Sequence, residues 1–201
     1  MEVTKVIVGD MQVNCYIVSN GIDAVVIDPG DEYEKIISAS QGKNIKAVLL
    51  THGHFDHTGA VKELQKNGAK VYISENDEHM LSDGYSCLAT PFGFPFNKIK
   101  ADYTFKDNDI LEFCDMSFKA ILTPGHTMGS VCFLVNDILF SGDTLFQQSI
   151  GRTDFPGGDF EAISKSIKEK IYTLSENTKV YPGHGGETTV EKEKQSNPFV
   201  R

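Results

Sequence analysis

The sequence predicts an α/β protein built as a four-layer αββα sandwich, in which two mixed β-sheets pack face to face with helices outside. Three observations support this fold class: strand-like runs come in groups, helical runs are interspersed, and the two halves of the chain look similar. Periodicity alone leaves other mixed arrangements open. At 201 residues and 40% hydrophobic content, the chain is long enough for one well-buried core. We therefore expect a single domain over residues 1–201.

The first part of the chain alternates between strand and helix patterns. Three strands are predicted from short, β-branched runs: Val3–Val8, Asn14–Val18 and Ala24–Ile27. Asn20-Gly21 between the second and third runs is typical of a hairpin turn. Asp28-Pro29-Gly30 ends the third strand, and Glu32–Ser40 has helical spacing.

A nearly continuous apolar run, Lys46–Leu50, predicts a strand that is buried on both faces. Thr58–Lys66 is predicted as a helix that Gly68 ends, Ala69–Ile73 as a strand and Asn76–Ser82 as a short helix. The following residues 83–98 are aromatic, punctuated by Pro and Gly, and without period. A loop this long and apolar usually packs over a site or moves over it.

The second half is again rich in strands. The predicted strands are Ile110–Phe113, Met116–Leu122, Ser130–Val135, Asp137–Phe140 and Lys179–Tyr181. Phe160–Leu174 is the clearest amphipathic helix, because its apolar residues recur on one face. Thr189–Gln195 is predicted as a last helix.

Composition and charge exclude several kinds of function. A net charge of −9 without a local cluster of Lys or Arg argues against nucleic acid as a partner, since phosphate binding needs a basic surface. No apolar run is long enough to span a membrane, and the N-terminus lacks the pattern of a signal peptide. We therefore expect a cytoplasmic protein.

The most informative feature of the chain is Thr51-His52-Gly53-His54-Phe55-Asp56-His57. Two further histidines follow Pro-Gly breaks, and together five of the six histidines lie in three loops. Each candidate ligand follows a predicted strand, so that loops at one sheet edge converge. The candidate metal ligands are His52, His54, Asp56, His57, His126, Asp143 and His184.

Imidazole and carboxylate groups are ligands for zinc and neighbouring metals. Seven such groups suit two ions that share one bridging carboxylate, and a paired centre lowers the pKa of a bound water molecule toward neutrality. Simpler explanations exist for single members. Asp56 is also placed to cap the helix after Thr58, and Asp143 follows Gly142 as in an ordinary turn. The remaining histidine, His79, lies in a charged stretch and is expected at the surface.

The pattern of His52, His54, Asp56 and His57, followed by His126, Asp143 and His184, resembles the ligand motif of the metallo-β-lactamase fold superfamily. The resemblance extends over essentially the whole chain, including Asn14-Cys15-Tyr16 and Asp28-Pro29-Gly30. It implies the αββα sandwich and two divalent metal ions. It places the first metal on His52, His54 and His126 and the second on Asp56, His57 and His184, with Asp143 bridging them.

Within the superfamily, Ser141–Phe146 and Ile150–Phe155 resemble the short members of the glyoxalase II group, the hydroxyacylglutathione hydrolases. This resemblance implies hydrolysis of a small-molecule acyl thioester such as S-D-lactoylglutathione by a hydroxide that bridges the two metals. Asp56 would orient the hydroxide, and the metals would be zinc, with iron or manganese as alternatives. The thiolate is a good leaving group, because a thiol pKa is about 8.5.

Two departures concern substrate binding. Long glyoxalase II proteins carry a C-terminal helical domain that contributes to glutathione binding, which we do not expect here. Those proteins also have a Lys and an aromatic pair where this chain has Arg152-Thr153-Asp154. We predict Arg152, Phe92 and Phe94 as substrate-binding residues. Arg152 would bind a carboxylate, or would instead form an ion pair with Asp154 or Asp159.

A second resemblance implies a different reaction. Persulfide dioxygenases share the Gly-Arg-Thr-Asp-Phe segment and use one iron, at positions matching His52, His126 and Asp143, as suits ferrous oxygen chemistry. Gly185-Gly186 after His184 departs from those enzymes. Hydrolysis of lactones or related esters is a third possibility, and the oligomeric state stays open.

Overall fold

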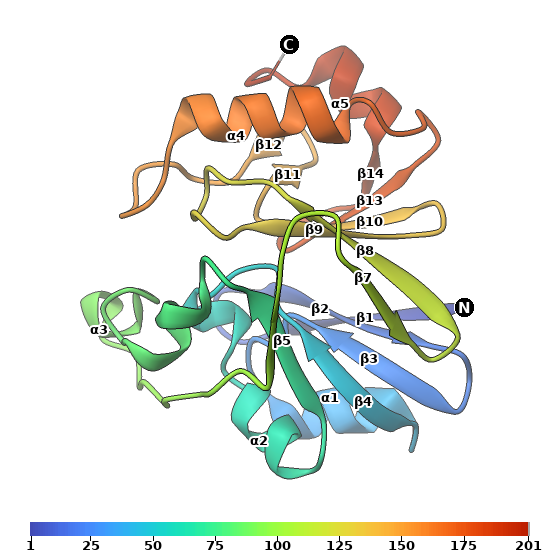
Figure 1. Ribbon diagram of the computed structural model, residues 1–201, viewed down its shortest axis with the longest axis vertical. Coiled ribbons are helices and arrows are strands. Elements are labelled where there is room, and N and C mark those ends of the chain that lie inside the picture. Colours follow the sequence, from blue (N-terminus) through green and yellow to red (C-terminus); the bar gives the residue numbers. More distant parts are fainter. Residues whose placement is uncertain (201) are drawn as a thin grey trace.

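The computed structural model of the protein describes residues 1–200. Two six-stranded sheets pack face to face, and helices cover the outer face of each (Figure 1). This arrangement confirms the αββα sandwich expected from the sequence. The first sheet and its helices come from residues 2–105, and the second sheet and its helices come from residues 110–196.

The first sheet is mixed. Its first three strands are antiparallel neighbours, and its last four are parallel to one another. The strands in spatial order are β1 (Glu2–Val8), β2 (Val13–Ser19), β3 (Asp23–Ile27), β4 (Asn44–Leu49), β5 (Lys70–Ser74) and β6 (Tyr103–Phe105).

The second sheet is also mixed, with one parallel pair, β10 and β13, among antiparallel neighbours. Its strands in spatial order are β14 (Thr188–Thr189), β13 (Lys179–Pro182), β10 (Ile138–Gly142), β9 (Val131–Val135), β8 (Met116–Leu122) and β7 (Ile110–Phe113). A small hairpin of β11 (Leu145–Phe146) and β12 (Ser149–Ile150) follows β10.

The helices lie on both outer faces. Those below the first sheet are α1 (Tyr33–Ser40) and α2 (Val61–Lys66), and those above the second are α4 (Phe160–Ser166) and α5 (Val190–Ser196) (Figure 1). Short helical segments are the 3₁₀ turns Phe55–His57 and Glu78–Ser82, α3 (Ala89–Phe92), and a π-helical turn at Ile167–Ile171. None of these described helices has the length and apolar character needed to cross a bilayer.

Alternation along the strands produces separate apolar layers. In β2, Cys15 and Ile17 face the helices of the first layer, whereas Tyr16 and Val18 face the second sheet. Fully buried rings from the second sheet complete the layer between the sheets: Phe118, Phe133 and Phe140. Burial of one such side chain contributes about 1.5–3 kcal/mol. The strands that end at the candidate site are thus packed from both sides.

The structure differs from the sequence prediction mainly in short elements. Four strands of two or three residues, β6, β11, β12 and β14, were not expected, because a run that short shows no period. The segment 83–98, expected to be irregular, contains α3. The predicted helix Phe160–Leu174 is α-helical only to Ser166 and continues as a π-helical turn to Ile171. Of the predicted apolar face, Ile163, Ile167 and Ile171 are buried, whereas Phe160 in the first turn is exposed, contrary to the prediction.

Candidate metal centre

All seven predicted ligands lie where strands end, at one edge of the two sheets. His52 and His54 follow β4, and Asp56 and His57 form the 3₁₀ turn after them. The other three come from the second sheet: His126 from the loop between β8 and β9, Asp143 from the end of β10, and His184 from the end of β13. The loops of the two sheets therefore meet across the interface between the sheets.

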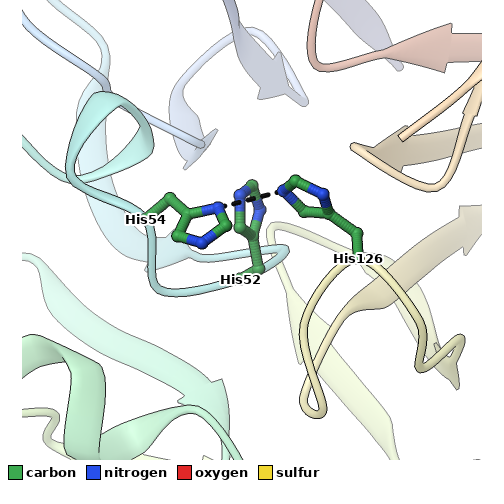
Figure 2. Close-up of side chains that lie close together, drawn as sticks. All are labelled: His52, His54 and His126. Carbon is green, nitrogen blue, oxygen red and sulfur yellow. Dashed lines mark hydrogen bonds between the residues drawn. The ribbon is translucent and has the colours of Figure 1, made fainter. Parts of the chain in front are cut away.

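The first group consists of His52, His54 and His126, whose ligand atoms all lie within 4.8 Å of one another. Figure 2 shows the three rings converging, with His54 Nδ1 and His126 Nε2 2.9 Å apart. All three side chains are buried. Burial, reinforced by the neighbouring His126, lowers the pKa of His54 to about 3. Burial and the surrounding imidazoles also hold the pKa of His52 well below its usual range. Both rings are therefore neutral at pH 7, which is the form that binds metals.

The second group consists of Asp56, His57 and His184, again within 4.8 Å of one another. His184 Nε2 lies 3.4 Å from Asp56 Oδ2, and His57 Nε2 lies 3.7 Å from the same oxygen. Burial works to lower the pKa of His57, but Asp56, Asp143 and Asp28 outweigh it and raise the pKa to about 10. Three carboxylates thus surround His57, and a cation bound there would take the place of the proton on its ring.

Asp143 lies between the two groups. Its Oδ1 is 3.4 Å from His57 Nε2, and its Oδ2 is 3.6 Å from both His126 Nε2 and His184 Nε2. His52, His57 and Asp143 also form a ligand-atom cluster of their own. One carboxylate therefore faces histidines of both groups, which is the position that a bridging ligand would need. Which ligands each ion takes remains a prediction.

The outer nitrogen of four imidazoles lies close to an oxygen atom. His126 Nδ1 lies 2.8 Å from Arg152 O, and His184 Nδ1 lies 3.1 Å from Met11 O. His52 Nδ1 lies 3.1 Å from Thr51 Oγ1, and His57 Nδ1 lies 3.0 Å from Asp28 Oδ2. His57 Nδ1 has no hydrogen-bond partner among the described residues, so this last contact is an electrostatic one. An Nδ1–H held by an outer oxygen leaves the Nε2 lone pair directed into the site.

Asp28 was not predicted as a functional residue, although it lies in a turn that the sequence indicates. Its carboxylate is buried and accepts hydrogen bonds from Thr51 N at 2.8 Å and Thr51 Oγ1 at 2.7 Å. The backbone of Asp28 is left-handed, with φ of 50°. Asp28 therefore connects the end of β3 with the start of the histidine loop and with His57. The sequence signal for this role was the position of Asp28 directly after a predicted strand, as the histidine loop directly follows the next one.

Asp77 was not predicted either. It is buried after β5 and accepts hydrogen bonds from Thr127 Oγ1 at 2.7 Å, Gly129 N at 2.8 Å and Gly53 N at 3.2 Å. It thereby joins the loop of His52 and His54 to the loop of His126. Burial raises the pKa of Asp77, and the three hydrogen bonds oppose that shift. An isolated Asp in a polar stretch carries no sequence signal for this role.

Strand β2 of the first sheet fixes the loop that carries His184. Asn14 Nδ2 donates to Pro182 O at 2.9 Å and to Gly185 O at 3.0 Å, and Tyr16 Oη donates to Pro182 O at 2.8 Å. These contacts connect the two sheets directly at the site. They give a physical role to the Asn14-Cys15-Tyr16 segment, which is part of the family resemblance.

The donor set fits divalent metal ions. Within residues 1–200, the buried side-chain atoms without a hydrogen-bond partner are His52 Nε2, His57 Nδ1, His57 Nε2 and Asp143 Oδ1. A buried polar atom without a partner costs about 1–3 kcal/mol, so their gathering at one point demands an explanation. Cations between the two groups would satisfy the inward-facing atoms among them, through nitrogen and oxygen ligands that zinc and iron accept.

The predicted substrate residues lie in two different places. Phe92 and Arg152 line a cavity together with His54, His126 and Asp143. Phe94 lines the adjoining cavity and stacks on Phe55, with ring centroids 4.6 Å apart. Of the alternatives for Arg152, the ion pair with Asp154 is present, at 2.7 Å between Nη2 and Oδ2. Asp56 does not cap α2, which begins at Val61 with Ala60 before it.

Fold and site together are typical of a metal-dependent enzyme, with its candidate ligands at one edge of an αββα sandwich. Comparison with known proteins agrees. The model of the metallo-β-lactamase superfamily matches residues 8–184. Among curated relatives, the hydroxyacylglutathione hydrolase GloC of Haemophilus influenzae is 36% identical over 208 residues, covering 100% of this chain and 98% of its own.

Two solved structures show the same architecture. The BLEG-1 B3 metallo-β-lactamase superposes with a TM-score of 0.94 at 37% identity, covering 99% of each chain. TTHA1623, solved in a di-iron-bound form, superposes with a TM-score of 0.88 at 36% identity, covering 98% of this chain and 100% of that one. This chain belongs to the metallo-β-lactamase superfamily, and it is a metallo-hydrolase with a His/Asp cluster suited to divalent metals.

Proposed function

We propose that the protein hydrolyses small-molecule acyl thioesters in the manner of glyoxalase II, with two divalent metal ions at the described centre. The observation that supports this most directly is the second ligand group, Asp56, His57 and His184, which shares Asp143 with the first. A centre for a single ion would not need it. The similarity to a hydroxyacylglutathione hydrolase over the full length of the chain supports the same reaction.

His52, His54 and His126 would hold one ion, Asp56, His57 and His184 the other, and Asp143 would contact both. Two such ions activate a water molecule and polarise a carbonyl oxygen. Zinc suits the ligand set, and iron or manganese are the alternatives. Arg152 O and Met11 O accept the outer N–H groups of His126 and His184 and so hold these rings in the ligand orientation.

Asp56 is the proposed catalytic residue. Burial works to raise the pKa of its carboxyl, but His57 and His184 outweigh burial and hold the pKa well below its usual range. The carboxylate is therefore ionised at neutral pH. It accepts a hydrogen bond from the attacking water molecule and orients that water toward the thioester carbonyl. Oxygen adds to the carbonyl carbon, the carbon–sulfur bond breaks, and a carboxylic acid and a thiol are released.

The leaving group needs little assistance, because a thiol with a pKa of about 8.5 departs readily as the thiolate. Esters and lactones lack this advantage. We therefore propose thioesters ahead of lactones or related esters as substrates. A small-molecule substrate also agrees with a net charge of −9, which disfavours nucleic acid.

The test combines elemental analysis of the purified protein with an assay of thiol release from S-D-lactoylglutathione. We expect about two metal ions per chain and turnover that depends on them. Asp56→Asn should lower kcat by about 100-fold to 10,000-fold, the range for loss of a proton-handling group. Asp83→Asn, an exposed change outside the site, is the matched control.

An oxygen-uptake assay with glutathione persulfide tests the dioxygenase alternative on the same preparation. One iron per chain, oxygen uptake with the persulfide and no thiol release from the thioester would contradict hydrolysis. Substitution of His57 also separates the two reactions. His57→Ala should abolish hydrolysis but spare a reaction that uses only His52, His126 and Asp143.

A further inference from the structure

A cavity of about 210 Å³ adjoins the ligand cluster, and five of the seven candidate ligands line it. The rest of its wall is formed almost entirely by apolar side chains: Met11, Phe55, Leu88, Phe92, Phe146 and Phe155. The thioester carbonyl must lie at the ligand cluster, so the substituents next to the scissile bond must lie against this wall.

The aromatic rings flank the cluster on two sides. The Phe92 centroid lies 6.2 Å from that of Phe55 and 5.8 Å from that of Phe155. The Phe155 ring in turn lies 6.0 Å from His54 of the first group. On the other side, the Phe146 ring lies 6.2 Å from His184 of the second group. Apolar surface therefore faces the substrate next to both ligand groups.

The one Lys or Arg side chain that the described part of the chain places in the cavity wall already has an ion-pair partner. Among the described residues, Arg152 is the only Lys or Arg that lines it. Arg152 Nε and Nη2 donate to the two carboxylate oxygens of Asp154 at 2.9 Å and 2.7 Å, and the guanidinium lies 4.1 Å from the Phe155 ring centroid. Although this ion pair is exposed, Asp154 competes with a substrate carboxylate for the guanidinium.

We propose that this cavity selects thioesters whose substituent next to the scissile bond is uncharged and apolar, rather than glutathione thioesters. The proposal rests on the thioester hydrolysis proposed above. Ionised carboxylates, of which glutathione has two, lose hydration against the apolar wall, and apart from the metal ions that the ligand cluster would hold, the only cation that the described residues place there is Arg152, already paired with Asp154. Alkyl or aryl groups lose nothing and remove apolar surface of Phe92 and Phe155 from water.

The apolar wall predicts a dependence on chain length. Each methylene buried against it should raise kcat/KM about fourfold, which corresponds to about 0.8 kcal/mol. Parts of a chain that extend past the wall into solvent should bring no further gain.

The experiment uses two series of thioesters with the metal-loaded protein, with thiol release as the readout. In the first series the thiol is N-acetylcysteamine and the acyl chain grows from acetyl to decanoyl. In the second the acyl group is acetyl and the thiol grows from ethanethiol to octanethiol. The series in which kcat/KM rises identifies the substituent that occupies the cavity. S-D-lactoylglutathione, which carries charged groups on its thiol, should be a poorer substrate than the best member.

Substitutions in and beside the cavity wall test which side chains cause the substrate selectivity. Phe92→Ala and Phe155→Ala should flatten the dependence on chain length. The matched control is Phe160→Ala, since Phe160 is 46% exposed, close to the 49% of Phe92, but does not line the cavity. Asp154→Asn should free Arg152 and raise kcat/KM for S-D-lactoylglutathione severalfold, with no change for uncharged thioesters. That gain should shrink at high salt.

Binding is measured separately by calorimetry with stable thioethers of N-acetylcysteamine. The S-hexyl thioether should bind more tightly than the S-ethyl thioether, and Phe92→Ala should remove the difference. Absence of turnover with every thioester would refute the proposed reaction, and the calorimetric comparison would still decide about the cavity. Equal binding of the two thioethers, or a preference for S-D-lactoylglutathione over all uncharged thioesters, would overturn the selectivity proposed here.

Discussion

Single atoms determine how the candidate ligands are presented. Arg152 O, Met11 O and Thr51 Oγ1 each hold the Nδ1 of a histidine, so that its Nε2 faces the site. A histidine without such a partner would rotate and would present either nitrogen. Close packing around Asp143 imposes a second constraint, on residue 183. Only glycine fits there, because a side chain would collide with Asp143.

This constraint leads to a prediction for Gly183→Ala. A Cβ at this position would lie 2.3 Å from Asp143 Oδ1 and 2.8 Å from His57 Cε1. Both side chains would have to move, so metal affinity should fall by about 10–100-fold, the range for lost support of a ligand. Competition with a chelator of known affinity measures the metal affinity of the variant.

Gly186→Ala is the matched control in the same loop. The Cβ there would meet only the flexible end of Gln147, at 2.6 Å from Oε1. It should therefore leave metal affinity unchanged. Equal losses in both variants would show that the loop as a whole, rather than space beside Asp143, determines binding.

At the level of secondary-structure elements, loops from different strands depend on one another. The loop after β4 and the loop between β8 and β9 approach each other in the fold, and the carboxylate of Asp77 joins them through three hydrogen bonds. Each loop contributes ligands to the first group. The distance between His54 and His126 therefore depends on a residue outside both loops.

Asp77→Ala should leave three donors without their acceptor in a buried position. The free energy of unfolding should fall by about 3 kcal/mol, since each buried unsatisfied group costs about 1–3 kcal/mol and water replaces part of the loss. Urea denaturation of the metal-free protein measures this. Metal titration should show weaker binding at the first group, because the loops separate.

Asp77→Asn distinguishes positioning from general destabilisation. It keeps one acceptor oxygen, and should restore part of both the stability and the metal affinity. The control is Asp137→Ala, which removes an exposed carboxylate at the turn between β9 and β10. Loss of stability with full metal affinity in Asp77→Ala would contradict the positioning role.

For the whole molecule, the site exists only when the two sheets are packed together. Four candidate ligands come from the first sheet and three from the second. The aromatic layer between the sheets, with Phe133 and Phe140, holds the two ligand sets at a constant distance. Metal binding and folding are therefore coupled, since the unfolded chain holds no such site.

This coupling predicts that metal ions raise the melting temperature. Zinc at 100 times its dissociation constant should stabilise the protein by about 2.7 kcal/mol. For a chain of about 200 residues each kcal/mol raises Tm by about 2–4 °C, so the increase should be about 5–10 °C. Differential scanning calorimetry with increasing zinc checks it. Magnesium, which prefers oxygen ligands, is the control and should have little effect.

Much of the fold could be recognised from local patterns. The strands of the central part of each sheet show β-branched or continuous apolar runs, and the buried face of Phe160–Leu174 shows helical periodicity. Short elements such as β6 and β11 could not be found, because two or three residues carry no period and their pairing depends on distant partners. No local sequence pattern indicated the change to a π-helical turn at Ile167 either.

The candidate ligands were recognisable for a related reason. A dense run of histidines, and Gly-His breaks that follow strands, are local properties of the chain, so His52 and His184 stand out by sequence position alone. Asp28 and Asp77 show no such local feature. Their roles consist of contacts to Thr51, His57, Gly53 and the His126 loop, and these contacts arise only when strands distant in sequence become neighbours.

The order of residues along the chain was thus sufficient for the main strands and the superfamily, and for choosing candidate ligands that the fold brings together. Packing of the two sheets supplied what a linear pattern cannot contain: the placement of Asp143 between two candidate ligand groups, the contacts of Asp28 and Asp77, and the apolar wall of the cavity beside the ligands. The physical reason is that ligand identity is a property of single residues, whereas distances, burial and charge compensation belong to pairs that only folding brings together.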